Sequence, residues 1–382
     1  MGKCLVTKLN GSISNSDILR IGEMRVHYNK VSAPSDKTQG FNIGVTNPVV
    51  LEIIGEGYFT DKTLTENKGK TLTLNAGTNS IWVSNNELEV AILNKYDLTT
   101  VTGVYTETGI GTENKSLNIE DFKYSKSLTS IFLSCTKTSG DIASLKNLTA
   151  LNYLQCYNTQ ISGDIASLKN LTALKIITVA NTQISGDIAS LKNLTALNVI
   201  NANNTQVSGD IASLKNLTAL NSIDLANTQV SGDVGKLATL TNLQSLNIIN
   251  TDNPLTGNVG KLSTLTKIKQ MILKNGKFTG DIATLADTCR YISFQNNVGT
   301  TLTWSTRPSS AKIIAIEGNA NLDNVDKMLQ DQAQCQVGFA SSDDIYYKKI
   351  AVTGTRTSAS DTAVQALQQK GYTVTINPAK SL

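Results

Sequence analysis

Between residues 128 and 294 the apolar positions recur in a fixed order, unlike the rest of the chain. One unit carries them at Leu174, Ile177, Val179, Ile184, Ile188, Leu191 and Leu194. The alternation of Ile177 and Val179 predicts a short strand that points both side chains inward. The spacing of three from Leu191 to Leu194 and Leu197 predicts a 3₁₀-like return segment. Each unit is therefore a strand followed by a turn and a return, and it needs neighbours to bury its apolar side chains.

The unit repeats every 23 residues, as its Gly-Asp landmark shows at Gly140, Gly163, Gly186, Gly209 and Gly232. The stretch SGDIASLKNLTAL occurs unchanged at 139–151, 162–174, 185–197 and 208–220. Two later units follow at Gly257 and Gly280, the first with an insertion near Asp252 and Pro254. Glycine suits a tight turn at this position. A period of this length is typical of a leucine-rich repeat solenoid.

The string NTQISGDIASLKNLTAL, which follows the strand at 158–174 and 181–197 and recurs with small changes in other units, resembles the leucine-rich repeats of plant receptor proteins and of many bacterial proteins. The plant form carries an Asn and then a Leu-x-Gly-x-Ile-Pro segment. Here Ala189 and its equivalents replace the proline, and the unit is one residue shorter. The resemblance covers about 128–294 and implies a solenoid. It does not imply one function, because such repeats serve many partners.

An Asn-Thr pair follows each predicted strand, at Asn158-Thr159, Asn181-Thr182, Asn204-Thr205, Asn227-Thr228 and Asn250-Thr251. We expect one of the two side chains to turn inward and to bind backbone groups of neighbouring coils. The spacing does not say which one. In the first coil Cys135 stands in place of the asparagine.

The strand positions vary from unit to unit while the return side stays constant. Their outward side chains are expected to line the concave face, where they form a candidate binding surface: Phe132, Tyr153, Gln155, Tyr157, Ile176, Thr178, Asn201, Asn203, Asp224 and Asn247. Phe132, Tyr153 and Tyr157 form a candidate aromatic anchor within it. The alternative is neutral drift at solvent-facing positions of recently duplicated units.

The flanks predict two further parts. Residues 1–103 contain strand-like runs at 49–54, 71–75, 81–84 and 88–93, separated by Gly- and Asn-rich turns, which indicates a β-sandwich or jelly-roll-like domain. The segment 104–127 leads into the first coil and is expected to cap it. Near the C-terminus, strand-like 313–319 and 348–354 each precede a helix-like stretch, and YTVTIN forms a final strand.

The expected fold class is thus mainly β with short helices: a leucine-rich repeat solenoid preceded by a β-sandwich-like domain and closed by an α/β cap. The expected domains are 1–103 for anchoring, 104–302 for the solenoid with its N-terminal cap, and 303–382 for degenerate repeats with the C-terminal cap.

Composition narrows the function classes. The 382 residues carry a net charge of +4 without a basic run, so nucleic-acid binding has little electrostatic support. The five cysteines are odd in number and widely spaced, which favours buried thiols over a disulfide framework or a zinc site. The N-terminal residues do not resemble a secretory signal, and no run of about 18 apolar residues predicts a membrane span.

Candidate chemistry is sparse. His27 is the only histidine and is expected to be a surface or packing residue. Glu52, Glu56, Glu87 and Glu89 include alternate strand positions that could pair carboxylates, although such spacing usually means a solvated face. The Asn-Leu-Thr triplets at Asn147, Asn170, Asn193 and Asn216 are explained as parts of the repeat. We expect no catalytic residue, metal or cofactor.

The expected function is therefore non-enzymatic binding or structural support, with another protein or a cell-surface glycan on the concave face. The segments MGKCLVTKLNGSI, KYDLTTV and KKIAVTGTRTSASDTAVQALQQKGYTVTIN resemble virion-associated proteins of tailed phages of gut Bacteroidetes. This resemblance implies a fibre, decoration or receptor-binding component in the virion, attached through residues 1–103. The alternatives are a bacterial surface adhesin, a cytoplasmic interaction scaffold and a glycan-processing enzyme. A homo-oligomer stays open, because no heptad enforces a trimer.

Overall fold

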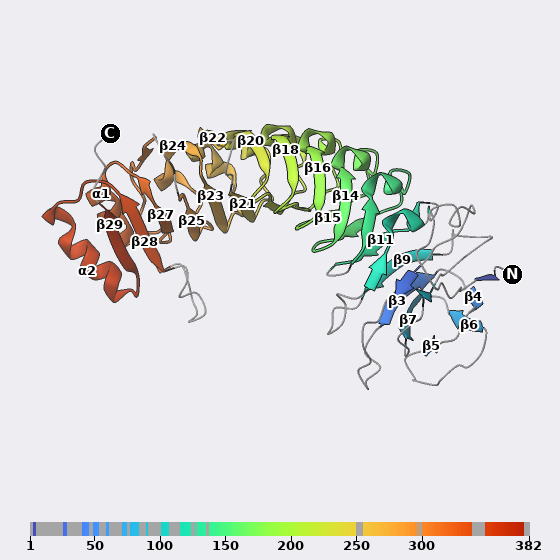
Figure 1. Cartoon of the computed structure of the whole chain (residues 1–382). Helices are drawn as coiled ribbons and strands as arrows, with labels where there is room; N and C mark the ends of the chain where they lie inside the picture. The colour runs from blue at the N-terminus through green and yellow to red at the C-terminus, as the bar shows by residue number, and fades with distance from the viewer. Residues whose placement is uncertain are drawn as a thin grey trace. The chain divides into compact units, whose positions relative to one another are not determined.

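The computed structural model describes short strands between residues 3 and 106, and then 115–123, 126, 128–134, 137–249, 255–295, 297, 300–337 and 348–377 (Figure 1). Side chains are described from residue 118 onward, Asp121, Asn319 and Ala320 excepted. The chain divides into two compact units, Met1–Gly186 and Asp187–Leu382, and each is described by itself.

The first unit begins with short strands: β1 (Lys3–Cys4), β2 (Val26–Tyr28), β3 (Gly40–Val45), β4 (Val49–Glu52), β5 (Phe59–Thr60), β6 (Thr71–Leu74), β7 (Gly77–Val83), β8 (Glu89–Val90), β9 (Val101–Thr106) and β10 (Lys115–Leu117). They form the orders β1-β4-β6, β10-β2-β8 and β5-β7-β3-β9. Strands lie in all four runs that the sequence predicts. The sandwich arrangement of residues 1–103 stays a prediction.

Strand β9 also joins the first coil of the repeat. It pairs antiparallel with β3 and parallel with β11 (Ser130–Phe132), which sets Val104 opposite Ile131. Residue 103, the end of the expected first domain, lies inside this strand. The domain division stays a prediction.

The coils of the first unit stack two parallel ladders. One contains β11, β13 (Tyr153–Gln155) and β15 (Ile176–Thr178), and the other contains β12 (Ser139–Asp141), β14 (Gln160–Asp164) and β16 (Gln183–Asp187). The 3₁₀ helices η5 (Ile142–Leu145) and η6 (Ile165–Leu168) form the return side, as the spacing of three predicts. Register places Ile131, Leu154 and Ile177 side by side, and all three are fully buried.

The second unit repeats this arrangement. Its first ladder contains β17 (Val199–Asn201), β19 (Ser222–Asp224), β21 (Ser245–Ile249), β23 (Gln270–Lys274) and β25 (Tyr291–Ser293). Its second contains β18 (Gln206–Asp210), β20 (Gln229–Asp233), β22 (Leu255–Asn258), β24 (Lys277–Asp281) and β26 (Leu302–Thr303). The return helices are η7 (Ile188–Leu191), η8 (Ile211–Asn216), η9 (Val234–Thr239), η10 (Val259–Thr264) and η11 (Ile282–Thr284). The mainly β solenoid is thereby confirmed.

The Gly-Asp landmark joins successive coils. Asp141 Oδ1 accepts a hydrogen bond from the Ala143 amide at 2.8 Å, which caps η5. The same oxygen lies over Gly163 of the next coil, where a Cβ atom would stand 2.1 Å from it. Gly163 also has φ of +106°, which L side chains rarely adopt. The glycine is therefore required by the aspartate of the preceding coil as well as by its own turn.

Asn118 provides the same joint before the first coil. Its Oδ1 accepts from the Glu120 amide at 2.9 Å, caps η4 (Ile119–Phe122) and lies under Gly140. Ile119 and Phe122 are fully buried. Asn118 and η4 therefore continue the joint one step before the first coil, and the expected N-terminal cap over 104–127 stays a prediction.

The structure decides which member of the Asn-Thr pair turns inward. Thr159 and Thr182 are buried, and each hydroxyl donates to a carbonyl three residues earlier at 2.6 Å. That carbonyl belongs to the same coil, so the expectation of a bond to a neighbouring coil is wrong for these two threonines. The asparagines are exposed in the left-handed region, with φ of 56° at Asn158 and 54° at Asn181, which asparagine tolerates better than most residues. Asn181 Nδ2 donates to Asn158 Oδ1 at 2.7 Å, so the asparagines form an outer ladder.

Replacing Thr205 by valine should therefore destabilise the second unit by about 1–2 kcal/mol. The Thr205 hydroxyl donates to the Ala202 carbonyl at 2.6 Å, and valine keeps the shape without the donor. Thr195→Val is the matched control, because Thr195 is exposed, and it should change stability by less than about 0.5 kcal/mol. Urea unfolding measures both variants. Equal losses would contradict the inward role of the threonine.

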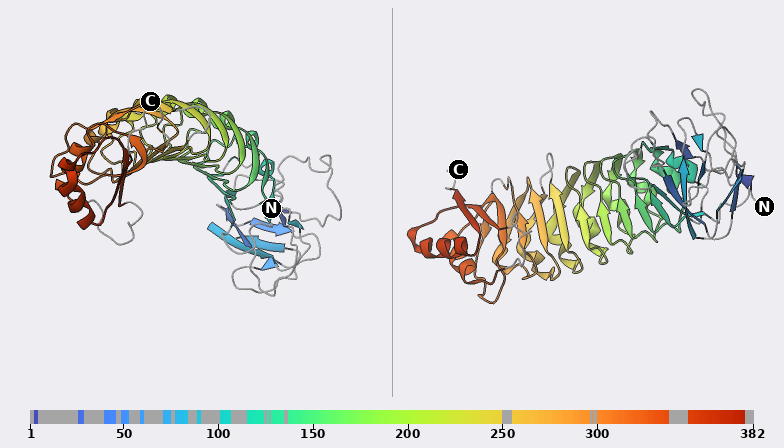
Figure 2. Two further views of the ribbon diagram at one scale, coloured as in Figure 1. Left: turned by 60° about the vertical axis from the view of Figure 1, so that its left-hand side comes forward. Right: turned by 90° about the horizontal axis from the view of Figure 1, so that it is seen from below.

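The C-terminal part of the second unit consists of two β–α units and a final strand, as predicted. Strand β27 (Ala315–Asn321) precedes α1 (Val325–Gln334), β28 (Lys349–Thr353) precedes α2 (Asp361–Gln369), and β29 (Thr373–Asn377) ends the sheet. The order β25-β27-β28-β29 is parallel throughout. Both helices pack side by side on one face of these strands (Figure 2). The α/β cap is confirmed.

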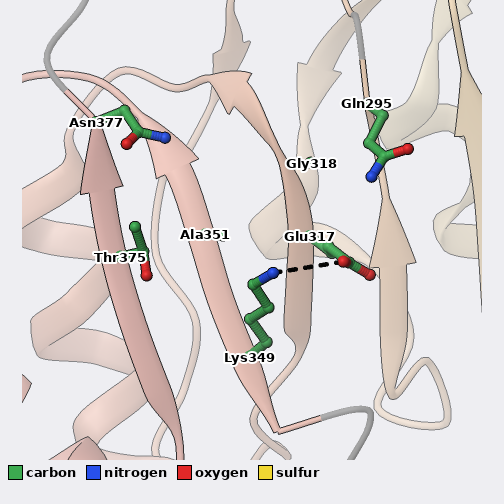
Figure 3. Close-up of a pocket in the computed structure, with 7 residues that line it drawn as sticks. All are labelled: Gln295, Glu317, Gly318, Lys349, Ala351, Thr375 and Asn377. Carbon is green, nitrogen blue, oxygen red and sulfur yellow. Dashed lines mark hydrogen bonds and ion pairs between the residues drawn. The ribbon is translucent and has the colours of Figure 1, made fainter.

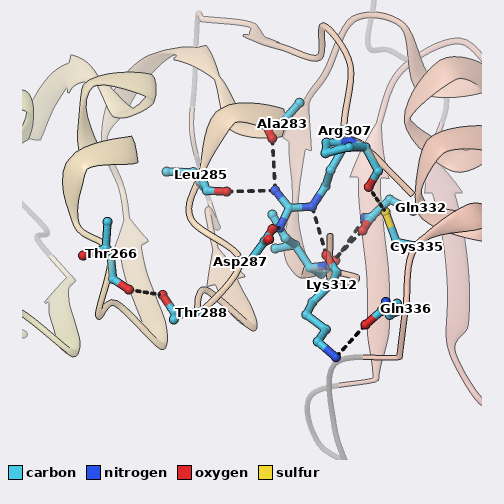
Figure 4. A network of polar contacts seen from close by, with 12 residues as sticks. Thr266, Ala283, Leu285, Asp287, Thr288, Arg307, Lys312, Gln332, Cys335 and Gln336 are labelled. Carbon is cyan, nitrogen blue, oxygen red and sulfur yellow. Dashed lines mark hydrogen bonds and ion pairs between the residues drawn. The ribbon is translucent and has the colours of Figure 1, made fainter. Parts of the chain in front are cut away.

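Arg307 joins the last coil to the segment that leads into β27 (Figure 4). Arg307 is 3% exposed, and its guanidinium donates to the carbonyls of Ala283, Leu285 and Lys312 at 2.9–3.0 Å. It also pairs with Asp287 at 3.2 Å. Burial lowers the pKa of Arg307, and the Asp287 charge opposes that shift. The guanidinium thus provides hydrogen-bond donors for carbonyl groups at the end of the short helix η11, which have no partner within the helix.

Candidate functional site

The predicted residues of the first unit lie on what we call the strand face, formed by the outward side chains of the strands in the first ladder. Phe132 and Tyr153 stack with ring centroids 6.3 Å apart and planes at 22°. Tyr153 is also the register partner of Ile176 on β15. All three are partly exposed, so they form one apolar patch, the anchor patch. Such a cluster has the composition of an interface hot spot.

The remaining predicted residues of this unit border the anchor patch. Gln155 and Thr178 continue the row of Phe132 on β13 and β15, and both are partly exposed. Tyr157 follows the end of β13 and is also partly exposed. Among the described residues it makes no ring contact with Phe132 or Tyr153, so the structure pairs two of the three predicted aromatics.

In the second unit the predicted residues form a hydrogen-bonded cluster. Asp224 accepts from Asn203 Nδ2 and from Asn247 Nδ2 at 3.0 Å, and from the Ala226 amide at 3.2 Å. Asn201 Oδ1 accepts from the Asn203 amide at 3.2 Å. The structure thus brings together Asn201, Asn203, Asp224 and Asn247, but much of their hydrogen-bonding capacity is used within the cluster. It therefore presents a fixed negative charge.

The sequence reasoning missed a hollow on the strand face of the C-terminal cap (Figure 3). Its volume is about 380 Å³, and it is lined by Gln295, Glu317, Gly318, Lys349, Ala351, Thr375 and Asn377. We call it the cap hollow. Glycine and alanine form part of its lining, and the other side chains are polar.

A β-bulge shapes this hollow. The register between β27 and β28 shifts between Ile316 and Ala320, and Gly318 within that stretch has φ of +106°. A Cβ atom at Gly318 would stand 2.5 Å from the Gln295 backbone nitrogen. A glycine inside a strand is a signal for a bulge, so the string AIEGN could have indicated this feature.

Glu317 is the carboxylate of the cap hollow. Its Oε2 accepts a hydrogen bond from the Tyr291 hydroxyl, and Lys349 Nζ lies 3.5 Å from its Oε1. The Tyr291 hydrogen bond lowers the pKa of Glu317, and the charges of Lys349 and Lys274 lower it further against the effect of burial. Glu317 is therefore ionised at neutral pH and already has partners.

The buried thiols offer no nucleophile. Cys156, Cys289 and Cys335 are free and buried, as predicted for inert cysteines. Burial raises the pKa of Cys289 to about 12 and raises that of Cys156 still further. The thiolate is the reactive form, so both are unreactive near neutral pH. The side chains of Cys4 and Cys135 lie outside the described residues.

No group of three or more His, Cys, Asp or Glu side chains that could hold a metal ion occurs among the described residues. The side chains of His27, Glu52 and Glu89 lie outside them, as do Glu56 and Glu87. The absence of catalysis, metal and cofactor stays a prediction. No helix in the described part of the chain is long and apolar enough to cross a membrane.

Comparison with known proteins gives the family. The family description "Leucine-rich repeat region" matches residues 113–312, just over half of the chain. The protein therefore belongs to the leucine-rich repeat family. No curated protein sequence matches the chain.

Solved structures resemble the chain at low identity. The ectodomain of the Arabidopsis thaliana receptor kinase GASSHO1/SCHENGEN3, in complex with Casparian strip integrity factor 2, is 22% identical with a TM-score of 0.45; the match covers 69% of this chain and 35% of that one. An internalin (inlF) of Listeria monocytogenes is 18% identical with a TM-score of 0.47, covering 76% and 85%. A second Listeria internalin, C2, is 25% identical with a TM-score of 0.41, covering 57% and 87%. These values carry no function over to this chain.

Proposed function

We propose that this protein is a protein-binding module that recognises its partner through the strand face of the first unit. The observation that carries the proposal is the anchor patch, in which Phe132, Tyr153 and Ile176 leave apolar surface partly exposed at varying positions of an otherwise constant repeat. Membership of the leucine-rich repeat family supports a binding role, although it does not identify the partner.

The cluster around Asp224 is proposed to contribute selectivity and not affinity. The side chains of the cluster hold one another in place by hydrogen bonds. The Asp224 carboxylate therefore loses little conformational entropy when a partner binds. A fixed negative charge of this kind repels acidic surfaces and favours basic ones.

Replacing Phe132 and Tyr153 together by serine should strongly weaken recognition. Truncating a central aromatic anchor weakens binding by about 2 kcal/mol or more, so the pair should lower partner recovery at least about tenfold. Immobilised protein is incubated with an extract of the cells that naturally encode it, and retained proteins are quantified by mass spectrometry.

The matched control is the double substitution of Gln160 and Gln183 by serine, because both side chains are exposed on the second ladder of the same unit. The control should retain the same proteins as the unaltered chain. Recovery that is unchanged by Phe132→Ser/Tyr153→Ser would sink the proposal, provided that circular dichroism shows the variant folded.

The more specific role that we propose is that of a virion component attached through residues 1–103. Its support is the resemblance of the three flanking segments to virion-associated proteins of tailed phages. Proteomics of purified, gradient-banded phage particles tests it. Stoichiometric presence in intact particles is expected. Absence from particles, with abundant protein in infected cells, would favour a cytoplasmic scaffold, and surface exposure on uninfected bacteria would favour an adhesin.

A further inference from the structure

The cap hollow contains hydrogen-bond donors that the fold leaves unused. Within the described part of the chain, no partner is present for the Thr375 hydroxyl or for the side-chain amide of Gln295. The Lys349 ammonium has three donors, and its one partner there is Glu317, at 3.5 Å. Figure 3 shows these three side chains around the same hollow.

The one carboxylate in the lining does not use up these donors. Glu317 takes the Tyr291 hydroxyl at Oε2, so it keeps a strong partner whether or not Lys349 stays beside it. The Lys349 side chain is 43% exposed and its pair with Glu317 is long, so that contact is weak. Lys349 can therefore contact Glu317 and a ligand together, or leave Glu317 for the ligand, with little loss of folding free energy.

The charge balance gives the class of ligand. Lys349 and Lys274 both act electrostatically on the single carboxylate Glu317, which leaves local positive charge. Free donors with excess positive charge suit a group that only accepts hydrogen bonds. A carboxylate fits that description with one negative charge, whereas a doubly charged phosphate would meet more repulsion from Glu317.

We propose that the cap hollow binds a carboxylate group of a partner polypeptide, with Lys349 as the cationic contact and Thr375, on the neighbouring strand β29, as a hydrogen-bond donor to that carboxylate. Gln295 lies two strands from Lys349, beyond β27, and is the donor to the adjoining backbone of the ligand. A volume of about 380 Å³ is at the lower end of ligand pockets, so it fits one acidic residue with its adjoining backbone. This site is separate from the anchor patch, and it stands or falls independently of the function proposed there.

Three small probes test the proposal on the full chain. N-acetyl-glutamate amide carries a side-chain carboxylate, N-acetyl-glutamine amide is its neutral counterpart, and N-acetyl-alanine carries a free α-carboxylate. Binding is followed through the methyl resonance of Ala351, which lines the hollow, in protein labelled at alanine methyl groups. Saturable shifts in the millimolar range with a carboxylate probe, and none with the glutamine probe, are expected.

Which carboxylate binds distinguishes an acidic side chain from a chain terminus, and either agrees with the proposal. Equal shifts with the glutamine probe, or no shift with any probe, would overturn it. Lys349→Gln and Thr375→Val should each weaken binding, the first by roughly tenfold, because a hydrogen bond to a charged group is lost.

Lys348→Gln provides the matched control. It removes the same charge one residue away, and the Lys348 side chain lies next to Gly371, away from the hollow. This variant should bind the carboxylate probe as the unaltered protein does. An equal loss in Lys348→Gln and Lys349→Gln would show a general charge effect and contradict a defined site.

Discussion

Replacing Gly209 by alanine is expected to destabilise the second unit by about 2–4 kcal/mol. The new Cβ atom would stand 2.0 Å from Asp187 Oδ1, which also caps η7 by accepting from the Ala189 amide at 2.8 Å. The substitution therefore strains its own backbone at φ of +102° and displaces the cap of the preceding coil. Urea unfolding followed by circular dichroism measures the loss.

Gly371→Ala is the control that distinguishes backbone strain at positive φ from the clash of the new Cβ atom with a neighbouring side chain. Gly371 also has positive φ, at 86°, but the nearest atoms to an added Cβ are those of Lys348 at 3.8 Å. It should lose only about 1 kcal/mol. Adding Asp187→Ala to Gly209→Ala should recover part of the loss, because the obstructing oxygen is gone. Equal losses at Gly209 and Gly371, or strict additivity with Asp187→Ala, would refute the proposed joint between coils.

Replacing Arg307 by methionine should destabilise the second unit by about 3–5 kcal/mol. Methionine fills much of the same space but leaves the carbonyls of Ala283, Leu285 and Lys312 without their donor. Thermal unfolding of the full chain measures the effect. The junction between the last coil and the segment that leads into β27 should be lost before the other coils unfold.

Arg356→Met is the control for charge. Arg356 pairs with Asp361 near the start of α2, where the Asp361 side chain is 58% exposed. Removing this pair should change stability by less than about 1 kcal/mol. If Arg307→Met were as mild as Arg356→Met, the guanidinium would not be what holds the last coil to the cap.

The sequence predicts the coil well because its local rules agree with one another. The alternation of Ile177 and Val179 and the spacing of three among the leucines each describe one segment, and both segments form as predicted. The β–α units of the cap follow for the same reason. Turn propensity explains why each glycine of the landmark adopts a positive φ, but not its close contact with the aspartate of the preceding coil.

Features that depend on contacts between coils could not be read from the spacing. The aspartate that requires the next glycine is 22 residues away from it, and the partners of Arg307 are mostly backbone carbonyls, which every residue has. The choice between asparagine and threonine depended on backbone conformation, because the left-handed asparagine leaves the threonine pointing inward.

The candidate site also has one part that the sequence predicted and other parts that it could not predict. Periodicity placed Phe132, Tyr153 and Ile176 on the strand face, and the structure brings them together. The periodicity could not show that Asn203 and Asn247 bind Asp224, because these hydrogen bonds join neighbouring coils. The cap hollow was missed because it arises from a bulge at Gly318 in a strand outside the regular repeat.

Hydrogen–deuterium exchange of the full chain, with and without the protein partner retained by the anchor patch, tests the central claim most directly. We expect slowed exchange in Ser130–Phe132, Tyr153–Gln155 and Ile176–Thr178, the strands that carry the patch. Slowing confined to the return side, η5 and η6, would contradict recognition through the strand face.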